Sequence, residues 1–333
     1  MKLYRPGSTN GTTRLRIILW AMFITSLCGM VAFGEPAEDV WLGVRNVIRS
    51  RPADGRIAIV GLDEATFRYF GTETFSQTKD AALIDNLFKA GAQRVFFDRT
   101  YSNTTDTIGD QAFIAALERH RGRVFLGTIN MPDPSTGKQT LIMPHPSFAR
   151  HAQLATLNGN ITPFQLSAKL PYQTNIDGVS IPSISSEISG VKNPNAADYR
   201  PDWSIQMRSI PTFSFLDVVQ GKLARNALAG KDVIVGPTSP RSHDYQRIVG
   251  QDWMPAVYFH AVGAQTLREG PPATMGWVPP YLVGLALSFA MLIATNRRQR
   301  LLTFGAGIGT ITIAPFILDA LLINGEYLPA TVL

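Results

Sequence analysis

The sequence predicts an α/β fold, with a mainly parallel sheet flanked by helices, attached to transmembrane α-helices. The sheet is indicated by three short β-branched runs, at 56–62, 94–97 and 231–236, each followed by polar residues. Strands buried on both faces read as continuous apolar runs of this kind, which is typical of parallel sheets. The membrane helices are indicated by long apolar stretches, one near the start of the chain and two near its end.

The composition fits a globular part combined with membrane segments. The 333 residues are 45% apolar and only 17% charged, and the single cysteine, Cys28, rules out an internal disulfide. The net charge of +6 comes from the segments that flank the apolar stretches, because the rest of the chain has 24 basic residues against 25 acidic ones. The charge therefore marks membrane topology, and no nucleic-acid partner is expected. The flanking basic residues are Lys2, Arg5, Arg14, Arg16, Arg297, Arg298 and Arg300.

Residues 1–16 form the predicted cytoplasmic amino-terminal segment, and residues 17–33 form the first predicted transmembrane helix. A cleaved signal peptide is the alternative, but its apolar core spans roughly 7–15 residues, which is shorter than this stretch. We therefore expect an uncleaved anchor. Its basic flank places the amino terminus in the cytoplasm by the positive-inside rule.

Two further apolar spans predict transmembrane helices at 277–295 and 301–323, joined by a cytoplasmic basic hairpin at 296–300. Residues 34–276 then form one domain outside the cytoplasm. Asp319 lies near the far end of the last span. We interpret it as an interfacial carboxylate, with a place in an ion pathway as the alternative.

The outer domain begins with a predicted helix at 38–51, in which apolar side chains recur at helical spacing before Pro52. An α/β pattern follows and is interrupted at 130–200, where Pro, Ser, Asn and Gly predict hairpins or loops with tight turns at Asn158-Gly159 and Asp177-Gly178. The expected helices lie at 80–90, 111–119, 214–225 and 257–267, and the later strands at 95–98, 123–128 and 232–236.

Several short pieces of this domain recur in a fixed order and spacing. They lie at 57–64, Phe97-Asp98, Asp110 with the helix after it, 212–219, 230–238, Asp244, Pro255 and His260-Ala261. In this order they resemble the CHASE2 family, an extracytoplasmic sensor module of bacterial signalling proteins. The resemblance covers about residues 36–323. The chain departs from the family pattern at 72–78, where members carry a Trp-Pro-Trp-Pro-Arg-like element, and at 255–258, where they carry Pro-Gly-Val-Glu.

The resemblance implies a multi-pass protein of the bacterial inner membrane with its sensory domain in the periplasm. It also implies one helix before the domain, usually three after it, and a cytoplasmic output that is commonly a nucleotide cyclase, a cyclic-dinucleotide phosphodiesterase or a kinase. Residues 324–333 are expected to start the third of those helices. The output is expected to lie outside this chain, so the chain itself is predicted not to be an enzyme.

Polar residues at the ends of the predicted strands form the candidate ligand site. Because the carboxyl ends of parallel strands meet at one edge of a sheet, we expect such residues to lie close together. Carboxylates with one imidazole would suit a small ligand or a hard cation. The alternative is structural, with the acids capping turns and helix starts and the imidazole hydrogen-bonded and half-buried. The candidate residues are Asp63, Glu64, Asp98, Asp244 and His260.

Two other functions compete with the sensor. A periplasmic metal-dependent hydrolase would use the same acids, but Thr100 stands where phosphatases with an aspartate nucleophile carry a second carboxylate. A non-sensing scaffold would bind a partner membrane protein through its helices. No cofactor and no catalytic residue is predicted. The expected partners are the lipid bilayer, a small-molecule or ionic ligand, and a second copy of the chain in a homodimer.

Overall fold

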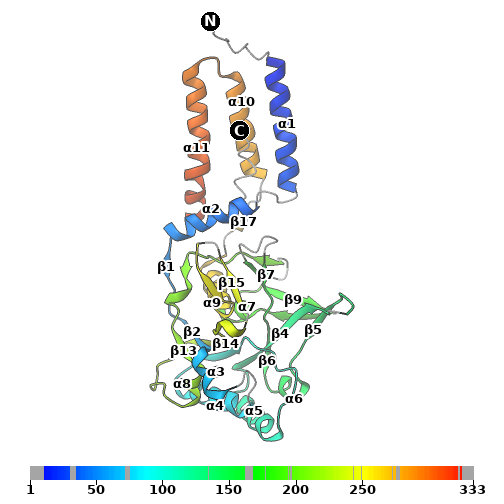
Figure 1. Cartoon of the computed structure of the whole chain (residues 1–333), viewed down its shortest axis with the longest axis vertical. Helices are drawn as coiled ribbons and strands as arrows, with labels where there is room; N and C mark the ends of the chain where they lie inside the picture. Colours follow the sequence, from blue (N-terminus) through cyan, green and yellow to red (C-terminus); the bar gives the residue numbers. More distant parts are fainter. Residues whose placement is uncertain are drawn as a thin grey trace. The chain divides into compact units, whose positions relative to one another are not determined.

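The computed structural model describes residues 11–30, 35–71, 76–133, 135–161, 168–176, 178–193, 195, 197–242, 244–248, 250–271, 273–274, 278–321 and 323–324. The chain divides into two compact units, drawn in Figure 1. The helical unit comprises Met1–Arg45 and Pro272–Leu333, and the α/β unit comprises Asn46–Pro271. The predicted outer domain at 34–276 is therefore longer than the compact α/β unit, because most of the helix that precedes this unit packs with the helical unit.

The α/β unit is built on a seven-stranded sheet with the order β13-β2-β14-β3-β4-β5, in which β6 also pairs with β4. All of its strand pairs are parallel except β4 with β5, so the predicted mainly parallel α/β fold is confirmed. The strands are β2 (Ile57–Leu62), β3 (Arg94–Phe97), β4 (Val124–Pro132), β5 (Gln139–Ile142), β6 (Gln153–Thr156), β13 (Thr212–Ser214) and β14 (Asp232–Pro237).

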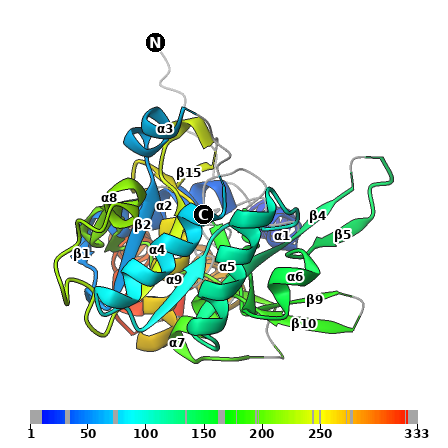
Figure 2. The same cartoon turned by 90° about the horizontal axis from the view of Figure 1, so that it is seen from below.

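Each face of the sheet packs against its own layer of helices. Ile57 and Ile59 of β2 join the core beneath α7 (Ile184–Ser189) and α9 (Val257–Glu269). The intervening Ala58 and Val60 join the opposite core, beneath α4 (Thr78–Lys89) and α5 (Thr107–Arg119), because side chains alternate between the faces of a strand. Figure 2 shows α4 and α5 side by side. All six residues of β2 are buried, as a strand covered on both faces requires.

Strand β14 lies between β2 and β3, although more than a hundred residues separate it from either strand in the sequence. Val233 pairs with Ala58 on one side and with Val95 on the other. The polar residues that follow these three strands therefore meet at one edge of the sheet. At this carboxyl edge the Thr238 side chain lies against Gly61, where any larger residue would collide with it.

Several predicted helix ends shift in the structure. The helix expected at 38–51 is α2 (Glu35–Ile48), and Arg51 instead begins β1 (Arg51–Pro52), which pairs in parallel with β12 (Ile205–Gln206). The helix expected at 214–225 is only α8 (Phe215–Val219), because Gly221 with a φ of +69° ends it. Helix α4 ends at Lys89, before Gly91 with a φ of +94°.

The region at 130–200 contains short strands, as predicted. Strands β9 (Gln173–Ile176) and β10 (Val179–Pro182) form a hairpin whose turn includes Gly178 with a φ of +79°, while Asp177 lies outside the described residues. The expected hairpin turn at Asn158-Gly159 is wrong, since β6 and the following β7 (Asn160–Ile161) do not pair. The Asn158 amide instead bonds the backbone of Asn130 at 2.7 and 2.8 Å.

The helical unit contains α1 (Gly11–Met30), α10 (Val278–Ile293) and α11 (Arg297–Ala320). Helix α10 packs between the other two (Figure 1). Among the described residues, α11 is long and apolar enough to cross a membrane, whereas Leu15–Leu27 and α10 are apolar but shorter. Residues 31–34, 275–277 and 325–333 lie outside the description, and β17 (Ala273–Thr274) pairs with β18 (Ile323–Asn324).

The predicted basic hairpin at 296–300 is shorter in the structure. Asn296 caps α11 by accepting a hydrogen bond from the backbone N–H of Gln299 at 2.9 Å, and the Gln299 side chain returns a bond to the cap. This capping box starts the helix at Arg297, so the arginines form the exposed first turn of α11.

Candidate functional site

Three of the five predicted site residues, Asp98, Asp244 and His260, come together at the carboxyl edge of the sheet, and we call them the edge cluster. Asp98 directly follows β3, and its backbone N–H donates to the carbonyl of Val235 at 2.8 Å. Its side chain lies over Gly236 of the neighbouring strand. A Cβ atom on Gly236 would stand 2.9 Å from the Asp98 Cβ, so only glycine leaves room for this carboxylate.

His260 reaches the same point from the opposite direction. It lies in the first turn of α9, and its Nε2 is 3.6 Å from Oδ1 of Asp98. This distance suits an attraction between charges but is too long for a hydrogen bond. The two side chains are only 5% and 8% exposed, so water does little to weaken the interaction.

Asp244 completes the cluster from the loop between β14 and β15 (Tyr245–Arg247). Its backbone carbonyl accepts a hydrogen bond from Ala256 at 2.9 Å, which ties this loop to the start of α9. Burial and then the charge of Asp98 raise the pKa of the Asp244 carboxyl to about 6, against the opposing effect of His260. The carboxyl therefore changes its charge in a mildly acidic medium.

The cluster holds polar atoms that its neighbours leave unsatisfied. Among the residues that the structure describes, Asp98 Oδ2 and His260 Nδ1 are buried without a hydrogen-bond partner. An orphaned buried polar atom costs about 1–3 kcal/mol, so native proteins retain one chiefly where it has a further role. These two atoms are positioned to take a proton, an ion or a polar ligand atom.

The other two predicted residues lie apart from the edge cluster. Asp63 caps α3 (Glu64–Phe70) by accepting hydrogen bonds from the Thr66 backbone at 2.9 Å and the Thr66 hydroxyl at 2.6 Å. Glu64 pairs with Arg241 at 2.7 Å and accepts a hydrogen bond from Ser239 at 3.1 Å. Glu64 thus fastens the loop after β14, and these contacts give both acids structural roles.

The charges of the edge cluster do not amount to a metal site. Within the described ranges, no group of three or more His, Cys, Asp or Glu side chains is placed to hold a metal ion. His243, the neighbour of Asp244, lies outside those ranges. The described geometry therefore offers no metal centre for the hydrolase alternative.

Comparison with known proteins adds one finding to this geometry. A family model of the CHASE2 domain matches residues 17–295. The chain belongs to the CHASE2 family. CHASE2 domains are extracytoplasmic sensory domains, so the edge cluster lies in a sensory domain. No curated protein and no solved structure matches this CHASE2 chain.

The two departures from the CHASE2 pattern differ in what the structure shows. Tyr258, which replaces the usual Glu, is buried in α9 and shares a 2.9 Å hydrogen bond with the hydroxyl of Thr212 beside β2. The substitution thus exchanges a carboxylate near the edge cluster for a neutral contact between α9 and the sheet. In the other departure, at 72–78, residues 72–75 lie outside the described part of the chain.

Sequence reasoning missed a second buried charged group in the CHASE2 domain. Arg99, the residue after Asp98, pairs with the fully buried Asp80 of α4 at 3.1 Å and lies 3.4 Å from the Tyr101 hydroxyl. Burial raises the pKa of Asp80, against the lowering effect of the Arg99 charge. The available signal was that consecutive residues of an extended strand point to opposite faces, so Arg99 had to face α4.

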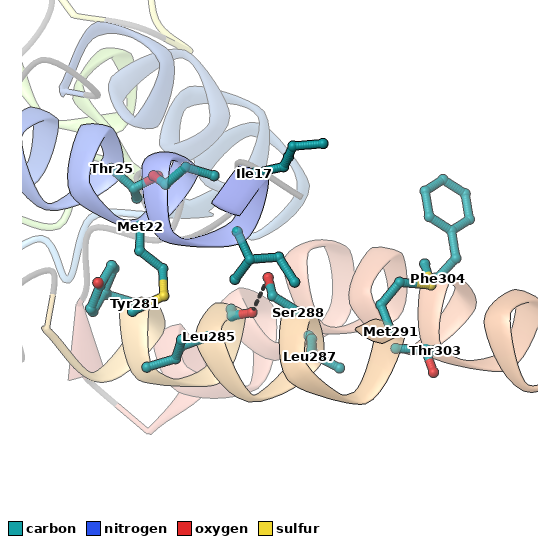
Figure 3. Close-up of a pocket in the computed structure, with 13 residues that line it drawn as sticks. Ile17, Met22, Thr25, Tyr281, Leu285, Leu287, Ser288, Met291, Thr303 and Phe304 are labelled. Carbon is teal, nitrogen blue, oxygen red and sulfur yellow. Dashed lines mark hydrogen bonds between the residues drawn. The ribbon is translucent and has the colours of Figure 1, made fainter. Parts of the chain in front are cut away.

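One cavity of the CHASE2 chain lies within the helical unit, between α1 and α10, and has a volume of about 340 Å³ (Figure 3). Its lining is largely apolar. The hydroxyls of Thr25 and Ser288 already donate within their own helices, to the carbonyls of Ala21 and Gly284 at 2.7 and 2.9 Å. The cavity therefore suits hydrocarbon better than a polar ligand.

The α/β unit has a cavity of its own, of about 330 Å³, beside the end of α2. Most of its polar groups already have partners. The Gln251 amide donates to the carbonyls of Trp203 and Ile205 at 2.6 and 3.0 Å, and Arg208 pairs with Asp252 at 2.7 Å. The buried Trp203 Nε1 is an exception, but this cavity lacks the opposed charges of the edge cluster.

Proposed function

We propose that this CHASE2 chain is a membrane-anchored sensor that detects a small ionic signal outside the cytoplasm and relays it through its helices. The observation that carries the proposal is the edge cluster. Two carboxylates face one imidazole in a buried position, and Asp98 Oδ2 and His260 Nδ1 have no hydrogen-bond partner among the described residues. A proton or a small cation at this position would change the charge balance at the start of α9.

Helix α9 is the element that would carry this change away from the cluster. It begins one residue after Ala256, whose N–H is bonded to Asp244, and it contains His260 near this end. At its other end, Glu269 forms a two-bonded pair with Arg51 of β1 at 2.5 and 3.2 Å. Because a packed helix moves as a unit, a shift at the edge cluster would reach β1, which directly follows α2.

Helix α2 is the link through which the change would leave the domain. It runs without interruption from Glu35 to Ile48, and the division between the two units falls inside it, after Arg45. Arg45 pairs with Asp319 of α11 at 2.7 Å, with both side chains almost fully buried. A tilt or rotation of α2 would therefore act on a helix long and apolar enough to cross a membrane.

The proposed topology has the amino terminus and residues 296–300 in the cytoplasm and the α/β unit in the periplasm, within a multi-pass inner-membrane protein. The exposed arginines in the first turn of α11 support this orientation, because cytoplasmic loops are enriched in Lys and Arg. The output in this proposal is a cytoplasmic cyclase, phosphodiesterase or kinase, reached by a homodimer of the chain. No chemical step is assigned to the chain itself.

The sensor proposal is tested by hydrogen exchange on the full chain in lipid nanodiscs at pH 5 and pH 7.5. We expect the start of α9 and residues 51–54 to change their protection between the two pH values. Asp244→Asn should abolish the change, because it removes the group that titrates in this range. Asp217→Asn, in an exposed pair with Lys222, should preserve it.

If wild type and Asp244→Asn respond alike, the edge cluster is not the input. A scaffold would show no pH-dependent change at residues 51–54 in any variant. The topology is tested separately by fusing a reporter that is active only outside the cytoplasm after Gly159. Activity there is expected, and its loss would contradict the orientation.

A further inference from the structure

Helix α2 has the reverse of the polarity that a helix in water shows. Its polar residues Asp39, Arg45 and Asn46 are buried, at 1–4% exposure. Its exposed residues include a set of apolar β-branched side chains, at 43–65% exposure. A helix on the surface of a soluble domain buries its apolar side and shows its charges to water. The exposed apolar residues are Val40, Val44, Val47 and Ile48, and we call them the α2 stripe.

The polar side of α2 is held by α11 of the same helical unit. Arg45 Nε donates to Asp319 Oδ2 at 2.7 Å, with side-chain exposures of 1% and 0%. The Trp41 ring packs edge-to-face on Phe316 at 5.9 Å, and the Arg45 guanidinium lies over the same Trp41 ring. These contacts fix the rotation of α2 about its own axis. The α2 stripe is exposed as a consequence of this packing.

The α2 stripe follows one side of the helix, because its residues are spaced by four, three and one positions. Helix α2 runs crosswise to α1, α10 and α11, as Figure 1 shows within the helical unit. On α11, Ile313 and Ile317 are 60% and 56% exposed, within two turns of Asp319. The apolar surface of α11 therefore continues up to the point where α2 is attached.

We propose that the α2 stripe lies in the membrane interface and contacts lipid acyl chains. In a bilayer, ionisable side chains turn towards protein partners and apolar ones turn towards lipid, and α2 shows this arrangement. Helices that lie flat in the interface bury an apolar side by roughly 5–10 Å. The crosswise direction of α2 and its continuity with the apolar surface of α11 match this placement.

A second copy of the chain is the competing occupant of the α2 stripe. Stable protein interfaces take about 20–30 residues from each partner, whereas the stripe offers four side chains on one short helix. A copy docked there would also have to compete with the lipid that surrounds α11. The observations therefore favour lipid, and the second copy is an outcome of the test.

The inference rests on the proposed membrane anchoring, and one experiment separates the two. In the full chain with Cys28→Ser, single cysteines carry an environment-sensitive fluorophore in lipid nanodiscs. Nitroxide on the lipid acyl chains and iodide in the buffer serve as quenchers. The positions are Val44→Cys on the α2 stripe, Ile308→Cys on α11 and Ile108→Cys on α5 of the α/β unit, where Ile108 is 76% exposed.

We expect the label at 44 to behave like the label at 308, with blue-shifted emission, quenching by the lipid nitroxide and loss of quenching by iodide. The label at 108 should respond to iodide alone. Quenching at 44 by iodide and not by lipid would overturn the inference, as would efficient disulfide formation between Val44→Cys copies. A label at 308 that the lipid nitroxide does not reach would instead contradict the membrane anchoring. Val40→Cys repeats the measurement one turn away.

Discussion

The end of β3 presents two buried charged groups on opposite faces of one sheet, and they differ in how their charges are matched. On the α4 face, Arg99 donates to Asp80 at hydrogen-bond distance, 3.1 Å. On the α9 face, Asp98 and Asp244 share one imidazole, at 3.6 Å from Asp98. Asp80 Oδ2 lacks a hydrogen bond as Asp98 Oδ2 does, but Arg99 balances the Asp80 charge. We infer that the first group holds the fold and that the second responds to ions.

The largest expected effect breaks the matched pair. Arg99→Met should lower the free energy of unfolding by about 3–5 kcal/mol, because it leaves Asp80 buried without its opposite charge. The measurement is denaturant unfolding of the full chain in detergent. Arg119→Met, which removes an exposed pair with Asp85, is the control and should cost about 0–1 kcal/mol. Equal losses in the two variants would show that the Asp80 pair is not structural.

A smaller effect is expected where Asp98 meets its glycine neighbour. Gly236→Ala should cost about 1–3 kcal/mol of stability, because its methyl group would stand 2.9 Å from both the Asp98 Cβ and Val257 Cγ2. It should also displace Asp98 and weaken the pH response in hydrogen exchange. Gly305→Ala on α11, which has no neighbour within 4 Å, serves as the control. An unchanged response would mean that the position of Asp98 is unimportant.

Removing a charge from the edge cluster should affect stability less than either change above. Asp98→Asn should alter the free energy of unfolding by no more than about 1 kcal/mol, because the lost attraction to His260 is offset by relief of repulsion with Asp244. The pKa of Asp244 should fall, since the Asp98 charge helps to raise it. Stability measured across pH reports both effects. A loss as large as that of Arg99→Met would erase the distinction between the two groups.

The smallest expected effect is the pH dependence that Asp244 gives to stability. Its pKa is about 6 in the folded chain against a usual 3.8, so the folded state binds the proton more tightly. Its contribution to stability is therefore full below pH 3.8 and falls as the pH rises to about 6. The difference between wild-type and Asp244→Asn unfolding curves over this range isolates the contribution. An opposite slope would contradict the assigned pKa.

The sequence sufficed to predict the strands around Val60, Phe97 and Val235 and the parallel sheet they form, because burial on both faces leaves a continuous apolar run. It also brought Asp98 and His260 to one edge. It did not predict β14 between β2 and β3, the Glu64–Arg241 pair or the Asp80–Arg99 pair. These contacts join segments far apart in the chain, and periodicity contains no information about which distant segment will be a neighbour.

Helix α2 shows a different kind of failure. Its apolar spacing correctly predicted a helix, and a reader of the sequence would place Val40 and Val44 in a core. The structure exposes them, because Arg45 and Asp39 occupy the inward side. Periodicity identifies a helix and its sides, but it does not identify the medium that each side meets.

The Arg45–Asp319 pair joins residues 274 positions apart in the chain, and this separation has a consequence for biogenesis. Asp319 is made last, and a lone carboxylate in an apolar helix is expensive to insert. Its counter-charge waits on a segment synthesised near the start of translation, so α11 reaches its final setting only after α2 is in place. We expect newly made Arg45→Leu chains to be degraded faster in a pulse-chase experiment than Arg268→Leu chains, in which a more exposed pair is lost. The pair would thereby act as a checkpoint on complete synthesis.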